Sequence, residues 1–116
     1  MFRDCSSLSS APELPATTLA NKCYDSMFYN CLSLSSAPEL PATNLAHSCY
    51  RSMFEGCTSL SEITVNFNNW GSINNTATLN WVAGVNSIGK FYCPAELPVI
   101  FGENRIPADW EVINLP

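Results

Sequence analysis

Apolar residues in the first half of the chain fall in pairs that are separated by two mostly polar positions. Spacings of three and four residues place side chains on one face of an α-helix. Pro15, with Thr17 or Thr18 after it, suits a helix start. The pattern therefore predicts a short amphipathic helix within residues 16–31, with its apolar face at Leu19, Ala20, Cys23, Tyr24, Met27, Phe28 and Cys31.

Short strands are expected between such helices. Leu60, Ile63 and Val65 have the spacing of a half-buried strand, which we expect to continue to Phe67. In the two earlier counterparts, prolines remove backbone donors, so those strands should end near Ala11 and Ala37. The tail predicts a helix from Thr76 or Thr78 to Val85, and strands at residues 90–93 and 110–113.

A repeat underlies this pattern. Residues 27–52 copy residues 1–26 except at positions 3, 4, 6, 18, 21, 22 and 25, and a partial third copy starts at Met53. A period of this size lies in the range of roughly 20–29 residues that stacked leucine-rich repeats use. Equivalent side chains should then form columns, one above another: Phe2, Phe28 and Phe54; Cys5, Cys31 and Cys57; Cys23 and Cys49; Leu8, Leu34 and Leu60.

The repeated motif Met-Phe-x-x-Cys-x-Ser-Leu-x-Ser-Ala-Pro-Glu-Leu-Pro-Ala-Thr resembles the BspA-like leucine-rich repeat of bacterial surface proteins. The resemblance is close over residues 1–61 and looser in the tail. It implies an α/β repeat: a right-handed leucine-rich-repeat solenoid of short parallel strands and short helices. Residues 62–116 are expected to form a carboxy-terminal α+β cap on the last repeat. Family members are mostly secreted or anchored adhesins without shared catalytic residues.

Met1 occupies the same repeat position as Met27 and Met53, so the chain opens within the repeat pattern and without a polar capping repeat. Because solenoid ends usually carry such a cap, we predict that the chain is the carboxy-terminal piece of a longer array. The alternative is a native start that matches the phase by chance. An extracellular or cell-surface location is expected, with a signal sequence in the missing amino-terminal part. The uncapped end, with Phe2 and Leu8 exposed, predicts self-association there.

Composition narrows the class of partner. The net charge is −5 with only five Lys and Arg, which argues against nucleic acid because phosphate binding needs clustered cations. No apolar run approaches the roughly 18–20 residues that cross a bilayer. We therefore expect a protein partner, and the resemblance implies a host extracellular or surface protein.

Six cysteines leave more than one chemistry open. Buried free thiols are expected in the two columns, where cysteine acts as a small hydrophobe. A disulfide remains an alternative, although side chains that point in parallel are poorly placed for one. Zinc is disfavoured because no Cys-x-x-Cys pair exists, so neither a metal nor a cofactor is expected.

Catalytic patterns are sparse. The single histidine, His47, is expected on a polar helix side, and Glu13 and Glu39 are explained as one exposed position copied twice. The sequence has no Gly-rich phosphate loop and no nucleophile elbow. We therefore expect no enzyme activity.

Three functions remain open on these residues. The first is a non-catalytic module for protein binding or adhesion, with contacts at the exposed repeated positions Glu13, Glu39, Ser10, Ser36 and Tyr29. The second is a spacer that projects another domain. The third is a glycan-binding module, if a tryptophan is exposed for sugar stacking. The main expectation for Trp70, Trp81 and Trp110 is instead core packing in the cap.

Overall fold

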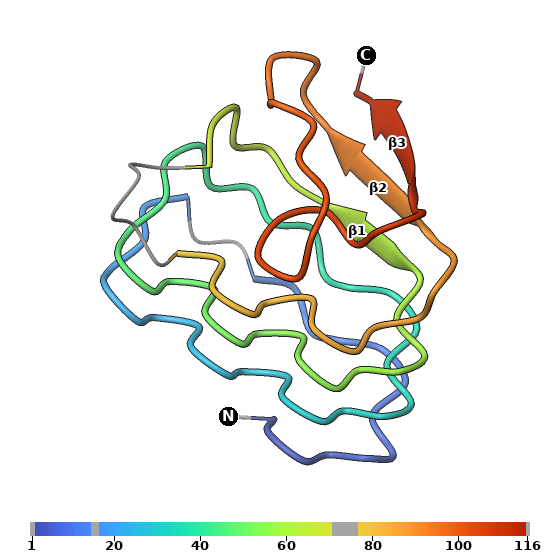
Figure 1. Ribbon diagram of the computed structural model, residues 1–116. Coiled ribbons are helices and arrows are strands. Elements are labelled where there is room, and N and C mark those ends of the chain that lie inside the picture. Colours follow the sequence, from blue (N-terminus) through green and yellow to red (C-terminus); the bar gives the residue numbers. More distant parts are fainter. Residues whose placement is uncertain (1, 15–16, 71–76, 116) are drawn as a thin grey trace.

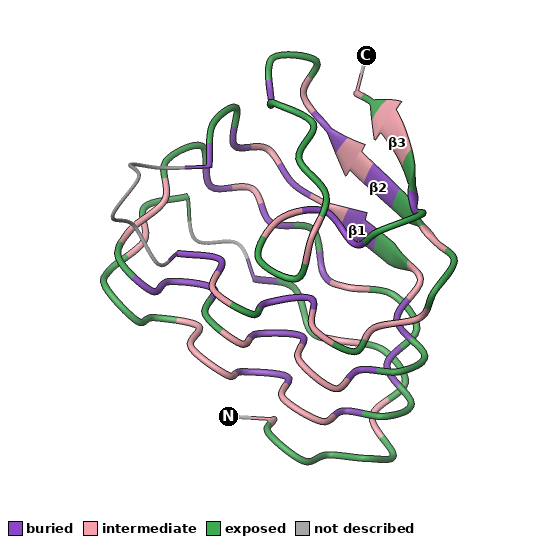
Figure 2. Ribbon diagram, in the orientation of Figure 1, coloured by how far each residue is buried: buried purple, intermediate pink, exposed green. Residues whose placement is uncertain are grey.

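The chain winds through successive turns that lie one above another. The computed structural model describes residues 2–14, 17–70 and 77–115. Figure 1 shows these turns rising from the N-terminus to the strands near the C-terminus. Buried residues line the inside of the stack, whereas its outer corners are mostly exposed (Figure 2). We call each turn of the chain a rung.

One side of the stack is a parallel β-sheet. Its strands are β1 (Glu62–Thr64), β2 (Lys90–Cys93) and β3 (Glu111–Asn114), in the order β1-β2-β3. Backbone hydrogen bonds extend the same pairing toward the N-terminus, from Ser61 to Ser35 at 3.0 Å and from Ser35 to Ser9 at 3.4 Å. The observed β2 has the predicted bounds, and β1 and β3 overlap the predicted strands. Each rung therefore contributes one short extended segment to this side.

The predicted fold class, an α/β leucine-rich-repeat solenoid with short helices and an α+β cap, is wrong. The described residues contain no helix, and their only sheet is the three-stranded one. Segments 20–31, 46–57 and 77–85, which the apolar spacing assigns to helices, are successive turns instead. Thr76, one of the two expected helix starts, lies outside the described residues. We call these three segments the turn ladder; they are the wavy parallel traces in the lower half of Figure 1.

Backbone hydrogen bonds explain why the turn ladder is not helical. In an α-helix every N–H donates to the carbonyl four residues earlier. Here alternate residues donate in different directions: Cys23 N–H donates to Ala20 within its own segment at 3.3 Å, but Tyr24 N–H donates to Cys49 in the next segment at 3.0 Å. Half of the donors thus join neighbouring rungs, so the ladder cannot exist in a single rung alone.

The turns also require left-handed backbone at every fourth residue. Positive φ angles between 51° and 80° recur along the ladder at Lys22, Ser26, Asn30, Ser48, Ser52, Gly56, Asn80 and Gly84. A left-handed non-glycine residue costs roughly 1–2 kcal/mol, least for Asn and Asp. The inter-rung hydrogen bonds and the packing of the rungs offset that cost. The apolar pairs of the ladder recur every four residues, whereas an α-helix has 3.6 residues per turn. This strict four-residue period is the sequence signal that distinguishes the ladder from a helix.

Aromatic rings stack in columns along the rungs. The rings of Phe2 and Phe28 are 5.6 Å apart and those of Phe28 and Phe54 are 5.9 Å apart, with interplanar angles of 4° and 1°. A second column places Tyr24 over Tyr50 at 6.1 Å. Trp81 ends both columns, with its ring 6.0 Å from Tyr50 and 6.0 Å from Phe54. Copies of the same side chain at the repeat spacing thus build one continuous core.

The tail closes the upper end of this core with its three tryptophans. Trp70, Trp81 and Trp110 are 5%, 0% and 3% exposed, respectively. Each indole N–H donates to a backbone carbonyl, on Pro98, Arg105 and Asn86, respectively, at 2.7–2.8 Å. The buried polar edge of each ring is therefore satisfied.

Candidate protein-binding groove

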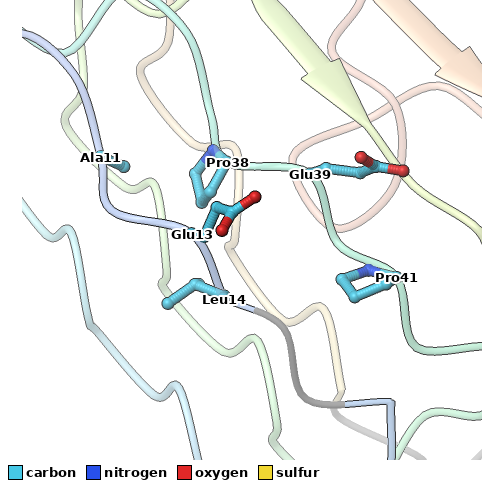
Figure 3. A pocket seen from close by; sticks show the side chains of 6 residues that line it. All are labelled: Ala11, Glu13, Leu14, Pro38, Glu39 and Pro41. Atoms are coloured by element: carbon cyan, nitrogen blue, oxygen red, sulfur yellow. The ribbon is translucent and has the colours of Figure 1, made fainter.

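A groove of about 310 Å³ lies between residues 11–14 of the first rung and residues 38–41 of the second rung (Figure 3). Two neighbouring passes of the chain form its walls, residues 11–14 and residues 38–41. We call this cavity the repeat groove. Its lining combines four apolar residues with two acidic ones: Ala11, Leu14, Pro38 and Pro41, and Glu13 and Glu39.

Proline positions explain why the rungs separate at this point. The first two rungs are joined by a bridge between Ser10 and Ser36. Beyond Ala11, the described residues 12–14 form no backbone hydrogen bond to the second rung. Pro12 has no N–H to donate, and Glu13 and Leu14 leave theirs unpaired within the described chain.

The next pair of rungs lacks this gap. Leu40 N–H donates to Thr64 at 3.1 Å, and Asn66 N–H donates back to Leu40 at 3.1 Å. The third copy has replaced the proline motif by the β1 sequence, so its backbone donors and acceptors pair normally. The groove is therefore specific to the two rungs that share the proline motif.

Two carboxylate side chains line the repeat groove. Glu13 and Glu39 are both exposed, and neither forms an ion pair or a side-chain hydrogen bond with any described residue. Figure 3 shows the Glu39 side chain directed away from that of Glu13, so the two acids do not form a pair aimed at one point. The groove therefore presents two separate negative charges beside an apolar surface.

The other predicted contact residues do not share one place. Ser10 and Ser36 form the bridge at which the groove begins, and the Ser36 hydroxyl lies 3.5 Å from a Glu62 carboxylate oxygen. Tyr29 is on the turn ladder, outside the groove lining, and the Arg3 guanidinium lies 4.6 Å from its ring centre. Four of the five predicted residues thus flank or line one surface, and Tyr29 belongs to another.

Sequence reasoning missed the apolar part of the groove. Leu14 is only 7% exposed and Pro38 is buried, yet both line the cavity. The verbatim repetition of Ala-Pro-Glu-Leu-Pro was the available signal, because two adjacent proline segments cannot complete a ladder between them.

The six cysteines are all free thiols. In the longer column, the Cys31 and Cys57 thiols donate to the backbone carbonyls of Phe2 and Phe28 at 2.9 and 3.0 Å. Burial raises the pKa of the Cys57 thiol to about 12 and that of Cys49 to about 11. Raised pKa values keep these thiols protonated and unreactive. Cys5 and Cys23 are exposed instead, because no other rung covers them.

Other chemistry has little support in the described residues. No group of three or more His, Cys, Asp or Glu is placed there to hold a metal ion. No helix in that part of the chain is long and apolar enough to cross a membrane. Sugar stacking on a tryptophan is excluded in this arrangement, because all three rings are buried.

Comparison with known proteins identifies no relative of this chain. No protein-family model, curated protein or solved structure matches the chain. A function must therefore be argued from the repeat groove and from the stack itself.

Proposed function

We propose that this chain is a non-catalytic protein-interaction module, and that the repeat groove binds an extended, basic segment of a protein partner. The observation that supports the proposal is the combination of an apolar lining with two unpaired carboxylates between adjacent proline segments. Alternating apolar and basic side chains on the partner would match that combination.

The backbone of the groove favours an extended partner. The N–H groups of Glu13 and Leu14 have no partner among the described residues. An extended peptide that lies along residues 11–14 offers carbonyls to such donors, as in strand addition to a sheet edge. Its apolar side chains would cover Leu14 and the prolines, and its cations would approach Glu13 and Glu39.

The resemblance of the repeat to BspA-like sequences supports the biological setting of this proposal. In that setting the module acts outside the cell or on its surface, and its partner is a host extracellular or surface protein. Residues 1–61 then supply the repeated binding surface, and residues 62–116 close the stack.

Binding to immobilised extracellular-matrix proteins tests the proposal. We expect saturable binding that weakens with added salt, and a Glu13→Gln/Glu39→Gln variant, which loses two charge pairs, should bind about 2- to 30-fold more weakly. Each exposed charge pair contributes on the order of 0.2–1 kcal/mol, which sets that range. A matched control is Glu96→Gln, an exposed glutamate outside the groove lining, which should bind like the unmodified chain.

Two outcomes would contradict this function. If no matrix protein is bound at any salt concentration, the chain is better described as a spacer. If the double variant binds as tightly as the unmodified chain, a surface other than the repeat groove is responsible.

A further inference from the structure

A second cavity lies next to the last segment of the turn ladder. Its volume is about 500 Å³, which falls within the range of roughly 300–1,000 Å³ that small-molecule sites occupy. We call it the loop cavity. It shares no lining residue with the repeat groove. One residue of the turn ladder and five consecutive residues of the tail line it: Asn80, and Phe101, Gly102, Glu103, Asn104 and Arg105.

Backbone hydrogen bonds fix the shape of the loop that forms this cavity. Gly102 N–H donates to the Ile106 carbonyl at 2.8 Å, and Ile106 N–H donates to the Ile100 carbonyl at 3.0 Å. The Asn104 side chain accepts a hydrogen bond from Asn80 N–H at 2.8 Å, which joins the loop to the turn ladder. Gly102 has a φ of 146°, and a Cβ there would meet no atom within 4 Å. The loop is therefore ordered before any ligand binds, and it borders open space.

The apolar part of the loop cavity is the ring of Phe101. This side chain is 51% exposed, whereas Phe67 and Phe91 in the same half of the chain are fully buried. Covering the exposed ring is favourable for a ligand that has a flat apolar side.

Side chains with free donors and acceptors surround that ring. The Asn80 side-chain amide and the Glu103 carboxylate form no hydrogen bond or ion pair with any described residue. The Asn104 amide uses its oxygen to accept from Asn80 N–H, so its Nδ2 remains a free donor. The Arg105 guanidinium is held in place through Nη1, which donates to the Thr78 hydroxyl at 2.9 Å. A ligand at Phe101 therefore meets both donors and acceptors.

The charges of the lining favour an uncharged ligand. Glu103 and Arg105 carry opposite charges and the other lining residues carry none, so the lining as a whole is neutral. An anion would approach Glu103 and a cation would approach Arg105, and each pairing is repulsive. An uncharged ligand matches this lining best if its polar groups both donate and accept, as hydroxyl groups do.

We infer that the loop cavity binds a neutral hexopyranose unit of an oligosaccharide or polysaccharide. One face of such a sugar ring presents C–H groups that cover Phe101, and its rim presents hydroxyls to Asn80, Glu103 and Asn104. The site requires no exposed tryptophan. It is separate from the repeat groove, so it adds a second class of ligand to the proposed protein binding.

A protein partner is the alternative occupant, because Val99 and Ile100 beside Phe101 are also 55% and 46% exposed. An apolar partner surface laid over Phe101 would leave the free groups of Glu103 and Asn104 unpaired, which is costly. Val99 and Ile100 do not line the loop cavity, so substitutions can separate the two occupants.

The test is a titration of the isotope-labelled chain with neutral oligosaccharides, followed by amide NMR spectra. The probes are cellohexaose, laminarihexaose, maltohexaose, mannohexaose and chitohexaose. We expect at least one of them to shift the backbone amide signals of Gly102, Glu103 and Asn104 saturably. The affinity should not change with added salt, because the ligand carries no charge for salt to screen. Binding at the repeat groove is expected to weaken with salt, so the two sites are distinguishable.

Three variants locate the contact. Phe101→Ala should weaken binding at least about tenfold because the stacking surface is lost, whereas Phe101→Tyr keeps the ring and should bind within about twofold of the unmodified chain. Ile100→Ala is the matched control, because Ile100 is similarly exposed but lies outside the lining. It should bind like the unmodified chain. Unchanged amide signals of β2 verify that each variant is folded.

The inference is overturned if none of these oligosaccharides binds, or if Phe101→Ala binds as tightly as the unmodified chain. It is also overturned if Ile100→Ala weakens binding as much as Phe101→Ala does. The whole exposed strip of residues 99–101 would then be the contact surface, as expected for a protein partner.

Discussion

At the scale of single residues, the position in the stack decides the chemistry of a repeated side chain. Cys57 is fully buried and donates to a backbone carbonyl, whereas Cys5, at the same repeat position, is exposed. Burial removes the water that would stabilise a thiolate, and this desolvation raises the pKa. The repeat therefore contains exposed and buried copies of one residue, and covering by another rung is what separates them.

The raised thiol pKa values predict a loss of stability in base. Unfolded thiols ionise near the ordinary value of 9.0, but folded Cys49 and Cys57 stay protonated up to about 11 and 12. Their contribution to the free energy of unfolding is thus complete below pH 9 and is lost as the pH rises through 11 to 12. Urea unfolding between about pH 8 and pH 11 should show this decline.

A Cys49→Ala/Cys57→Ala variant provides the comparison. It should be less stable at neutral pH because it loses packing, but its stability should decline less steeply above pH 9. The two chains differ only at positions 49 and 57, so the difference between the two slopes reports the removal of these two thiols. Equal slopes would show that these two thiols do not control the base sensitivity.

At the scale of the element, the turn ladder and an α-helix predict opposite effects of glycine. Lys22 has a φ of 60°, and its side chain forms no ion pair with the described residues. Lys22→Gly relieves left-handed strain of roughly 1–2 kcal/mol, partly offset by the greater entropy of the unfolded chain. We expect a change from neutral to about 1 kcal/mol of added stability, measured by urea unfolding.

Glu55→Gly is the control within the same ladder. Glu55 has no positive φ, so glycine there should cost about 0.5–1 kcal/mol. In a helix both substitutions would be destabilising by about 1 kcal/mol. A loss of that size for Lys22→Gly would therefore argue against the left-handed turn at this residue.

At the scale of the whole molecule, the two ends of the stack differ in how their backbone groups are satisfied. The upper end is closed by residues 103–105, because the Asn104 side chain accepts from Asn80 N–H and the Arg105 carbonyl accepts from the Trp81 indole. At the lower end, the carbonyls of Asn21, Cys23 and Asp25 accept no backbone hydrogen bond from the described residues. Residues 103–105 therefore satisfy donors of the last turn segment that no further turn segment of the described chain receives.

Removing the closing amide should open the upper end. Asn104→Ala leaves Asn80 N–H without its 2.8 Å acceptor, and we expect a loss of about 0.5–2 kcal/mol, as for a helix N-cap. Thermal unfolding measures the loss, and faster hydrogen exchange of the Asn80 amide locates it. Glu103→Ala keeps its backbone carbonyl and should be close to neutral. If both variants lose the same stability, the Asn104 side chain is not what closes this end.

The sequence by itself determined the repeat, the columns and the approximate positions of β1, β2 and β3. The strands expected to end near Ala11 and Ala37 are instead joined only by the isolated bridge between Ser10 and Ser36. Identical residues at a fixed spacing must occupy equivalent places when rungs stack, so Phe2, Phe28 and Phe54 were identifiable as one set. The acidic positions of the groove were also identifiable, because Glu13 and Glu39 recur within an otherwise apolar motif. These features depend on residue type and spacing, which a sequence contains directly.

Only the tertiary structure decided what the turn segments and the proline segments become. A rung in isolation has no neighbour to receive its alternate N–H groups, so local spacing favours a helix where the stack forms left-handed turns. The repeat groove likewise exists only between two adjacent rungs, where Pro12 cannot pair and Leu14 turns inward. Both outcomes follow from hydrogen bonds and packing between residues about 25 positions apart, and no local pattern contains that information.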